Sequence, residues 1–135
     1  MEERCVVEVE ELHRFFEEWF DGSVEQTGKG LQRFIGVLAD DFELISPDGI
    51  QIGRVALIGR VRKAHGIHRD HNARNQVEAI RVRAVGPGLY LVRYEEWQQR
   101  DGSPRGRLSS ALLRERAGTP NGLEWVHVQE TWLPR

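Results

Sequence analysis

The chain has 135 residues, of which 39% are hydrophobic and 30% charged, and its formal net charge at pH 7 is −2. This length and composition are typical of one globular domain over residues 1–135, and no apolar run approaches the roughly 20 residues of a membrane span. Cys5 is the only cysteine and the start of the chain is acidic, unlike a signal peptide, so we expect a cytoplasmic protein without disulfides or a membrane partner.

The first predicted elements are two helices. Apolar residues recur at helical spacing from Val9 to Phe20 while glutamates take the other face, which predicts a long helix that ends at Asp21. A shorter second helix is predicted from the apolar spacing between Leu31 and Leu38.

A hairpin and a third helix are predicted next. Residues 41–46 and 50–52 have the pattern of two strands, and Pro47-Asp48-Gly49 has the composition of the turn between them. A helix over residues 54–65 should end near Gly66. The side that it should bury consists of Val55, Ile58, Val61 and Ala64.

The second half of the chain predicts four long strands, over residues 77–85, 89–99, 107–116 and 123–133. The loops between them are rich in glycine, proline, aspartate and asparagine, which favour turns. Because strands follow strands without crossover helices, the pattern predicts an antiparallel meander and the α+β fold class.

Charge is unevenly distributed along the chain. Residues 1–48 hold 13 acidic and 4 basic residues, whereas residues 54–83 hold 8 basic and 2 acidic residues. A basic segment is one feature of nucleic-acid-binding proteins. These bases are dispersed along a predicted helix and strand without a recognised motif, so we expect a solvated face and no nucleic-acid partner.

The order of elements, the Trp19-Phe20 pair that closes the first helix and the tryptophan-containing last strand resemble the nuclear transport factor 2-like superfamily, including its SnoaL-like members. Segments 91–97, 101–105 and 125–131 are similar to the association domain of calcium/calmodulin-dependent protein kinase II. The resemblance implies a cystatin-like cone, in which three helices from the first half pack on a strongly curved antiparallel sheet around a pocket. It implies this fold more than an activity, because the superfamily includes isomerases, polyketide cyclases and oligomerisation modules.

A pocket wall is predicted on strand 89–99. Side chains alternate along a strand, so one face consists of Leu91, Arg93, Glu95 and Trp97. The resemblance implies that Arg93 points into the central pocket, and the other members of its face should follow it.

The last strand is predicted to supply a second wall. Its face with Val126, Val128, Glu130 and Trp132 is the one that the resemblance places inward, and Glu130 stands where the kinase domain has an arginine. A small, partly apolar ligand is expected there. The predicted ligand-binding residues are Trp19, Phe20, Arg93, Glu95, Trp97 and Glu130. The alternative is a structural salt-bridge network or a solvated face.

Three residues are candidates for acid/base chemistry: Glu130, His127 and Asp41. His127 has the opposite parity to Glu130, and its alternative role is in a dimer interface on the outer sheet face. Asp41 follows Asp40, and because neighbouring strand residues point to opposite sides, the two cannot form a dyad. Solvation is the alternative for both aspartates.

Three histidines are spaced by three residues, as metal ligands on a helix can be: His65, His68 and His71. Gly66 and the polar run at residues 69–72 indicate that the helix has ended before they could converge. We therefore expect no metal site, and no motif predicts a cofactor.

Two functions remain open from the sequence. One is a small-ligand-binding pocket protein, whose enzymatic form would have acid/base activity like that of ketosteroid isomerases or polyketide cyclases. The other is a non-catalytic homodimeric scaffold with a vestigial pocket, paired through the outer sheet face. The charges at Arg93, Glu95 and Glu130 favour a ligand, because a vestigial pocket would more readily hold apolar residues.

Overall fold

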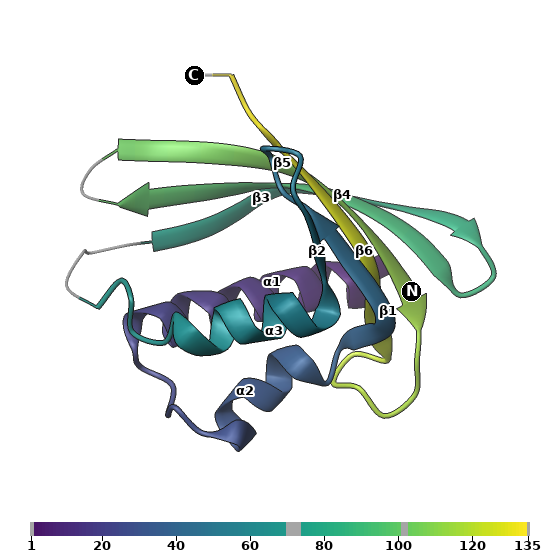
Figure 1. Ribbon diagram of the computed structural model, residues 1–135. Helices are drawn as coiled ribbons and strands as arrows, with labels where there is room; N and C mark the ends of the chain where they lie inside the picture. The colour runs from purple at the N-terminus through teal and green to yellow at the C-terminus, as the bar shows by residue number, and fades with distance from the viewer. Residues whose placement is uncertain (1, 70–73, 101–102, 135) are drawn as a thin grey trace.

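The computed structural model describes residues 2–69, 74–100 and 103–134, and within them the chain forms three helices and a six-stranded sheet. The helices are α1 (Glu2–Asp21), α2 (Gly28–Ile35) and α3 (Arg54–Lys63). The strands are β1 (Leu38–Ile45), β2 (Gln51–Gly53), β3 (Arg74–Gly86), β4 (Leu89–Arg100), β5 (Ser103–Glu115) and β6 (Leu123–Trp132). These helices all lie on one side of the sheet (Figure 1), so the predicted α+β class is confirmed.

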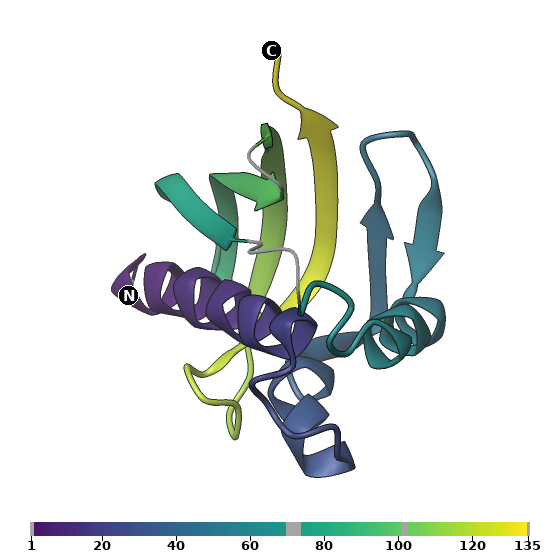
Figure 2. The same cartoon turned by 90° about the vertical axis from the view of Figure 1, so that its left-hand side faces the viewer.

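The strands are arranged in the order β2-β1-β6-β5-β4-β3. Neighbours are antiparallel except β1 and β6, which run parallel with Leu44 opposite Val128. The long strands bend over α1 (Figure 2), which gives the sheet an inner face toward the helices and an outer face away from them. The last strand in sequence therefore lies between the first strand and the meander.

The helix boundaries differ from the predicted ones for local reasons. Helix α1 begins at Glu2, seven residues before Val9, because its first turn carries acidic residues that suit a helix N-terminus. Helix α2 begins after Thr27, whose hydroxyl oxygen accepts a hydrogen bond from the Gly30 amide at 2.9 Å, as an N-cap residue does. The same helix ends at Ile35, and Leu38 belongs to β1.

Helix α3 buries a narrower side than predicted. Ile58 and Val61 are buried against the core, and Leu57 packs against it, whereas Val55 is 82% exposed. The helix packs mainly against the β1–β2 hairpin, and the residue one turn earlier remains in solvent. None of the described helices is long and apolar enough to span a lipid bilayer.

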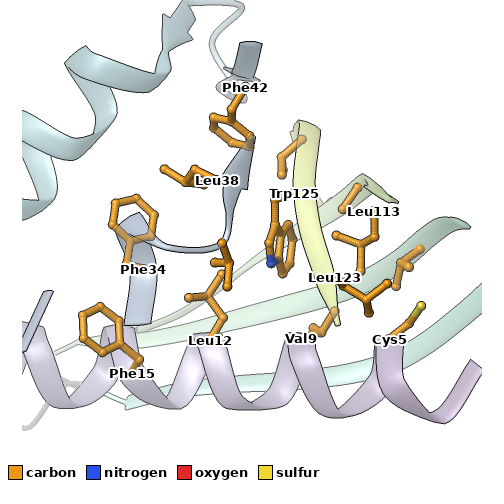
Figure 3. Packing of buried hydrophobic residues seen from close by; sticks show 14 of the residues in the cluster. Cys5, Val9, Leu12, Phe15, Phe34, Leu38, Phe42, Leu113, Leu123 and Trp125 are labelled. Carbon is orange, nitrogen blue, oxygen red and sulfur yellow. The ribbon is translucent and has the colours of Figure 1, made fainter. Parts of the chain in front are cut away.

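The hydrophobic core lies between α1 and the inner face of β5 and β6. Cys5, Val9 and Leu12 project from α1 toward Leu113 and Trp125 (Figure 3). Trp125 faces inward because of a β-bulge: Leu113 pairs with Trp125 but Leu112 pairs with His127, so Val126 is the extra residue. Because of the bulge, Trp125 faces inward although it was predicted to face outward. Val128 and Glu130, which follow the bulge, face inward as predicted.

A buried carboxylate ties α1 to three other parts of the chain. Glu8 has no exposed surface, and its Oε1 accepts hydrogen bonds from Arg33 (2.8 Å) and Asn121 (2.9 Å). Its Oε2 accepts one from the Trp125 indole N–H at 2.8 Å and a second from Arg33 at 3.2 Å. This arrangement satisfies both carboxylate oxygens, which is the condition under which a charge is tolerated inside a protein.

Candidate functional site

A cavity of about 310 Å³ lies between the inner face of the sheet, α1, α3 and the β1–β2 hairpin. Much of its wall is apolar, including Phe16, Phe20, Phe34, Phe42, Leu57 and Val128. Its polar wall contains His13, Tyr94, Glu96, Arg107 and Glu130. A largely apolar cavity with a few convergent polar groups is the usual form of a small-molecule site.

The polar wall is built from two rows that cross three adjacent strands. In the first row, Tyr94 of β4 is opposite Ser109 of β5, which is opposite Glu130 of β6. In the second row, Glu96 is opposite Arg107. Because side chains alternate along strands, both rows project from the same inner face.

Arg107 joins the carboxylates of the two rows. Its Nη2 donates to Glu96 Oε1 at 2.6 Å, and its Nη1 donates to Glu130 Oε1 at 3.4 Å. His13 reaches the same Glu96 oxygen from α1, with 3.7 Å between Nε2 and Oε1. The other ring nitrogen of His13 donates to the Val9 carbonyl at 2.8 Å, which fixes the orientation of the imidazole.

The buried pairing shifts the pKa values of His13 and Glu96 in opposite directions. Burial acts to lower the pKa of His13, but the Glu96 carboxylate beside it outweighs burial and the pKa is raised. Burial acts to raise the pKa of Glu96, but His13 and Arg107 lower it far below its ordinary value. The pairing therefore favours the imidazolium form of His13 and the carboxylate form of Glu96.

Glu130 has the opposite behaviour to Glu96. Burial raises its pKa, and the nearby Glu96 charge adds to the rise, while Arg107 only partly opposes it. Glu130 thus keeps its proton to a higher pH than an ordinary glutamate, as a group suited to proton transfer does. The pKa of Tyr94 is also raised, mainly by burial, so its hydroxyl remains protonated and can donate a hydrogen bond.

One polar atom of this wall, the buried Nε of Arg107, lacks a partner among the residues that the structure describes. Buried polar groups are nearly always hydrogen-bonded, so this atom calls for a water molecule or a ligand. Beside Glu130, it provides a donor for one small polar group.

The structure brings only part of the predicted ligand-binding set to the cavity. Phe20 and Glu130 line it. Trp19 is instead a core residue, 1% exposed, whose indole N–H donates to the Val61 carbonyl at 2.7 Å. The role of Glu130 in binding or catalysis stays a prediction.

The parity predicted for β4 is wrong. Arg93, Glu95 and Trp97 lie on the outer face, while Tyr94 and Glu96 face the cavity. Trp97 covers the backbone of Gly106 on the neighbouring strand, where an added Cβ atom would lie 2.8 Å from the ring. The indole N–H of the same residue donates to Glu95 at 3.1 Å, so both side chains interact on the outer face.

His127 and Asp41 do not join Glu130 in one site. His127 lies on the outer face, where its Nδ1 is 3.2 Å from Glu43 Oε1. Asp41 is exposed, and Arg114 is 4.0 Å from its carboxylate. An acid/base role for either residue in the cavity is therefore wrong on geometry.

The histidines considered for metal binding have separate surroundings. His65 Nε2 donates to the Val24 carbonyl at 2.6 Å, and the His68 ring packs edge-on against Phe20. His71 lies outside the described residues. Across residues 2–69, 74–100 and 103–134, no group of three His, Cys, Asp or Glu side chains is placed to hold a metal ion.

The sequence contains signals for the residues that were missed. His13 interrupts the apolar stripe of α1, four residues after Val9 and three before Phe16. Glu96 ends the more apolar alternating set of β4, which begins with Tyr90, Val92 and Tyr94. A charged or titratable residue in an apolar stripe is the pattern expected of a buried ion pair. Arg107 carries no such signal, because its strand mixes polar and apolar residues on both faces.

Comparison with known proteins gives one family match and several relatives. A family model described as sucrose-6-phosphate phosphohydrolase C-terminal matches residues 6–134. Sucrose-phosphatase 1 of Nicotiana tabacum is 27% identical over 127 residues, which are 93% of this chain and 30% of the tobacco protein. The chain thus spans about 30% of the length of the curated relatives it matches.

Solved structures share the fold at low sequence identity. A nuclear transport factor 2-like protein of unknown function from Pseudomonas aeruginosa has a TM-score of 0.84 at 23% identity, over 97% of this chain and 99% of that one. A protein assigned as a calcium/calmodulin-dependent kinase II association domain from Exiguobacterium sibiricum has a TM-score of 0.61 at 18% identity, over 98% and 92% of the two chains. These likenesses confirm the nuclear transport factor 2-like, cystatin-like fold that the sequence predicted.

Proposed function

Because the chain belongs to the sucrose-6-phosphate phosphohydrolase C-terminal family, and because it contains the cavity, we propose that it binds a small, uncharged, partly apolar molecule with hydroxyl groups. The observation that carries the proposal is the Arg107–Glu130 pair in the wall of a largely apolar cavity. The curated relatives are named sucrose-phosphatases, which makes sucrose the first compound to test.

The chemistry of the polar wall favours a hydroxyl group as the bound polar group. Glu130 offers an acceptor or, when protonated, a donor, and the unpaired Arg107 Nε offers a donor. A hydroxyl group can donate to the first and accept from the second. Arg107 is already paired with two carboxylates, so its charge is offset and an uncharged partner is favoured over an anion.

Acid/base activity of the kind found in ketosteroid isomerases or polyketide cyclases would rest on Glu130. Its raised pKa brings its proton transfer closer to neutral pH, and the apolar wall would keep water away from a bound molecule. Glu96, whose pKa is lowered, would remain a carboxylate that orients Arg107 and His13.

A ligand screen with Glu130→Gln tests the proposal. Sucrose, sterols and polyketide-like lactones are tested for thermal stabilisation, which reaches about 2.7 kcal/mol for a ligand at a hundredfold excess over its Kd. We expect Glu130→Gln to weaken binding of any active compound about tenfold, because a neutral amide replaces a carboxylate that can accept a charge-assisted hydrogen bond. Isothermal titration calorimetry measures the change in Kd.

The matched control is Glu95→Gln, which alters a carboxylate on the outer face and should leave the Kd unchanged. Equal affinity of wild type and Glu130→Gln for every active compound would contradict the proposed site. A stable protein that responds to none of the compounds would contradict the ligand class.

A second candidate function is a non-catalytic homodimeric scaffold, and the outer face of the sheet favours it. Leu112 lies opposite Leu91 on this face, and His127 lies beside it. Such a dimer should bury roughly 1,200 Å² or more in total. Light scattering that reports a monomer at micromolar concentration would exclude it.

A further inference from the structure

Three arginines surround a hollow of about 300 Å³ on the outer face of the sheet, opposite to the cavity. Arg81 and Arg83 come from β3 and Arg93 from β4, and Val82, Leu91 and Ser110 complete the wall. We call this group of six residues the arginine hollow. It shares no residue with the cavity, so it requires an explanation of its own.

The arginines are placed where their charges repel one another. Arg81 is directly opposite Arg93 in the β3–β4 register, and Arg83 follows on the same face of β3. Like charges directly opposite each other destabilise a sheet. Within the part of the chain that the structure describes, none of the three guanidinium groups has a hydrogen bond or an ion pair.

Two neighbouring carboxylates on this face, Glu78 and Glu95, form no ion pair with the arginines among the described residues. Glu78 is opposite Glu95, so a pair of glutamates follows the Arg81–Arg93 pair in the β3–β4 register. A β-bulge separates the two pairs, and Ala79 within it has a φ of 54°, a backbone conformation rare outside glycine. Glu95 accepts the Trp97 indole N–H, so its carboxylate already has a partner away from Arg93.

We propose that the arginine hollow binds a phosphate group, either as inorganic phosphate or as the phosphate of a small ester. Guanidinium groups bind phosphate through paired, charge-assisted hydrogen bonds, and the Ser110 hydroxyl supplies a further donor. A dianion between Arg81 and Arg93 converts their repulsion into attraction to a shared partner. The arginines line one hollow and not an extended stripe, which favours a single phosphate group over a nucleic-acid strand.

The experiment is an NMR titration of the purified chain at constant ionic strength. The probes are inorganic phosphate, glucose 6-phosphate, glucose and sodium chloride, and the signals are the Arg Nε–H groups and the Ser110 amide. We expect saturable shifts with both phosphates and none with glucose or chloride. Tighter binding of glucose 6-phosphate than of inorganic phosphate would identify the ester as the source.

Two variants sharpen the test. Arg93→Gln should weaken phosphate binding about tenfold, because charge-assisted hydrogen bonds are lost. It should leave the melting temperature without phosphate unchanged or higher, because the repulsion with Arg81 is removed. Arg62→Gln, at an exposed position of α3, is the matched control and should keep the affinity of wild type.

The proposal is overturned if phosphate shifts no signal of the hollow, if chloride at equal ionic strength reproduces the shifts, or if Arg93→Gln and Arg62→Gln bind phosphate alike. Binding only to a nucleic-acid strand, with no response to either phosphate, would also overturn it. Because the hollow and the cavity lie on opposite faces, none of these results depends on the proposed cavity ligand.

Discussion

Glu8→Ala is expected to lower the free energy of unfolding by about 3 to 5 kcal/mol, the usual effect of removing one partner from a buried ion pair. The substitution leaves Arg33 without its bidentate partner and deprives the Trp125 indole of its acceptor. Arg33 and Asn121 keep only their hydrogen bonds to Glu11 of α1, at 3.4 Å and 2.8 Å. Urea unfolding at pH 7, followed by tryptophan fluorescence, measures the change.

The matched control for this prediction is Glu10→Ala. Glu10 is on the same helix but exposed, so its removal should change stability by no more than about 0.5 kcal/mol. Equal effects of the two substitutions would show that the Glu8 network contributes little to stability. A loss of binding at the cavity without a loss of stability would also contradict a structural role for Glu8.

Glu96→Gln is expected to be the most damaging substitution in the polar wall, with a loss of about 3 kcal/mol of stability at neutral pH. It removes the charge that pairs with both Arg107 and His13, and leaves Arg107 with the longer contact to Glu130. Glu95→Gln, one residue earlier but on the outer face, should cost far less. Urea unfolding of the two variants measures the difference.

The same substitution should change how stability depends on pH. The pKa of Glu96 is lowered on folding, so its stabilisation is present above its ordinary pKa of 4.5 and is lost as the pH falls below that value. The pKa of His13 is raised on folding, so its stabilisation is present below 6.5 and is lost as the pH rises through the folded value. We expect Glu96→Gln to reduce both the loss of stability at low pH and the loss of stability as His13 is deprotonated.

NMR titration of His13 tests this coupling directly. In wild type its pKa should exceed 6.5, and in Glu96→Gln it should fall, because burial then acts without the opposing carboxylate. An unchanged His13 pKa in Glu96→Gln would show that the two side chains are not coupled. A pKa below 6.5 in wild type would contradict the ion pair itself.

The sequence was sufficient to predict the order and type of the elements. Hydrophobic periodicity located α1, α2, the β1–β2 hairpin and the four long strands, because these elements bury one face or stripe each. It was less informative for α3, where Val55 continues the helical spacing but has nothing to pack against. Periodicity reports which side chains could be buried, whereas the neighbouring elements decide which of them are.

The candidate site was predicted only in part, because parity depends on register. On β4 the resemblance implied that Arg93 faces the cavity, but the next residue, Tyr94, faces it instead. On β6 the inward placement of Glu130 agrees with the structure, yet the bulge at Val126 also turns Trp125 inward. A shift by one residue reverses every side chain of a strand, and a single sequence does not specify where bulges occur.

The position of β6 has a consequence for how the chain folds. Strand β1 has two neighbours in the sheet, the three-residue strand β2 and the last strand, β6. Until β6 is available, β1 can pair only with β2. The β1–β6 pairing spans about 80 residues of sequence, and such long-range contacts form slowly because loop closure must come first. During synthesis on the ribosome, the β1 edge that later pairs with β6 would therefore remain unpaired until β6 has been made. A chaperone that covers this edge at that stage should increase the yield of folded protein.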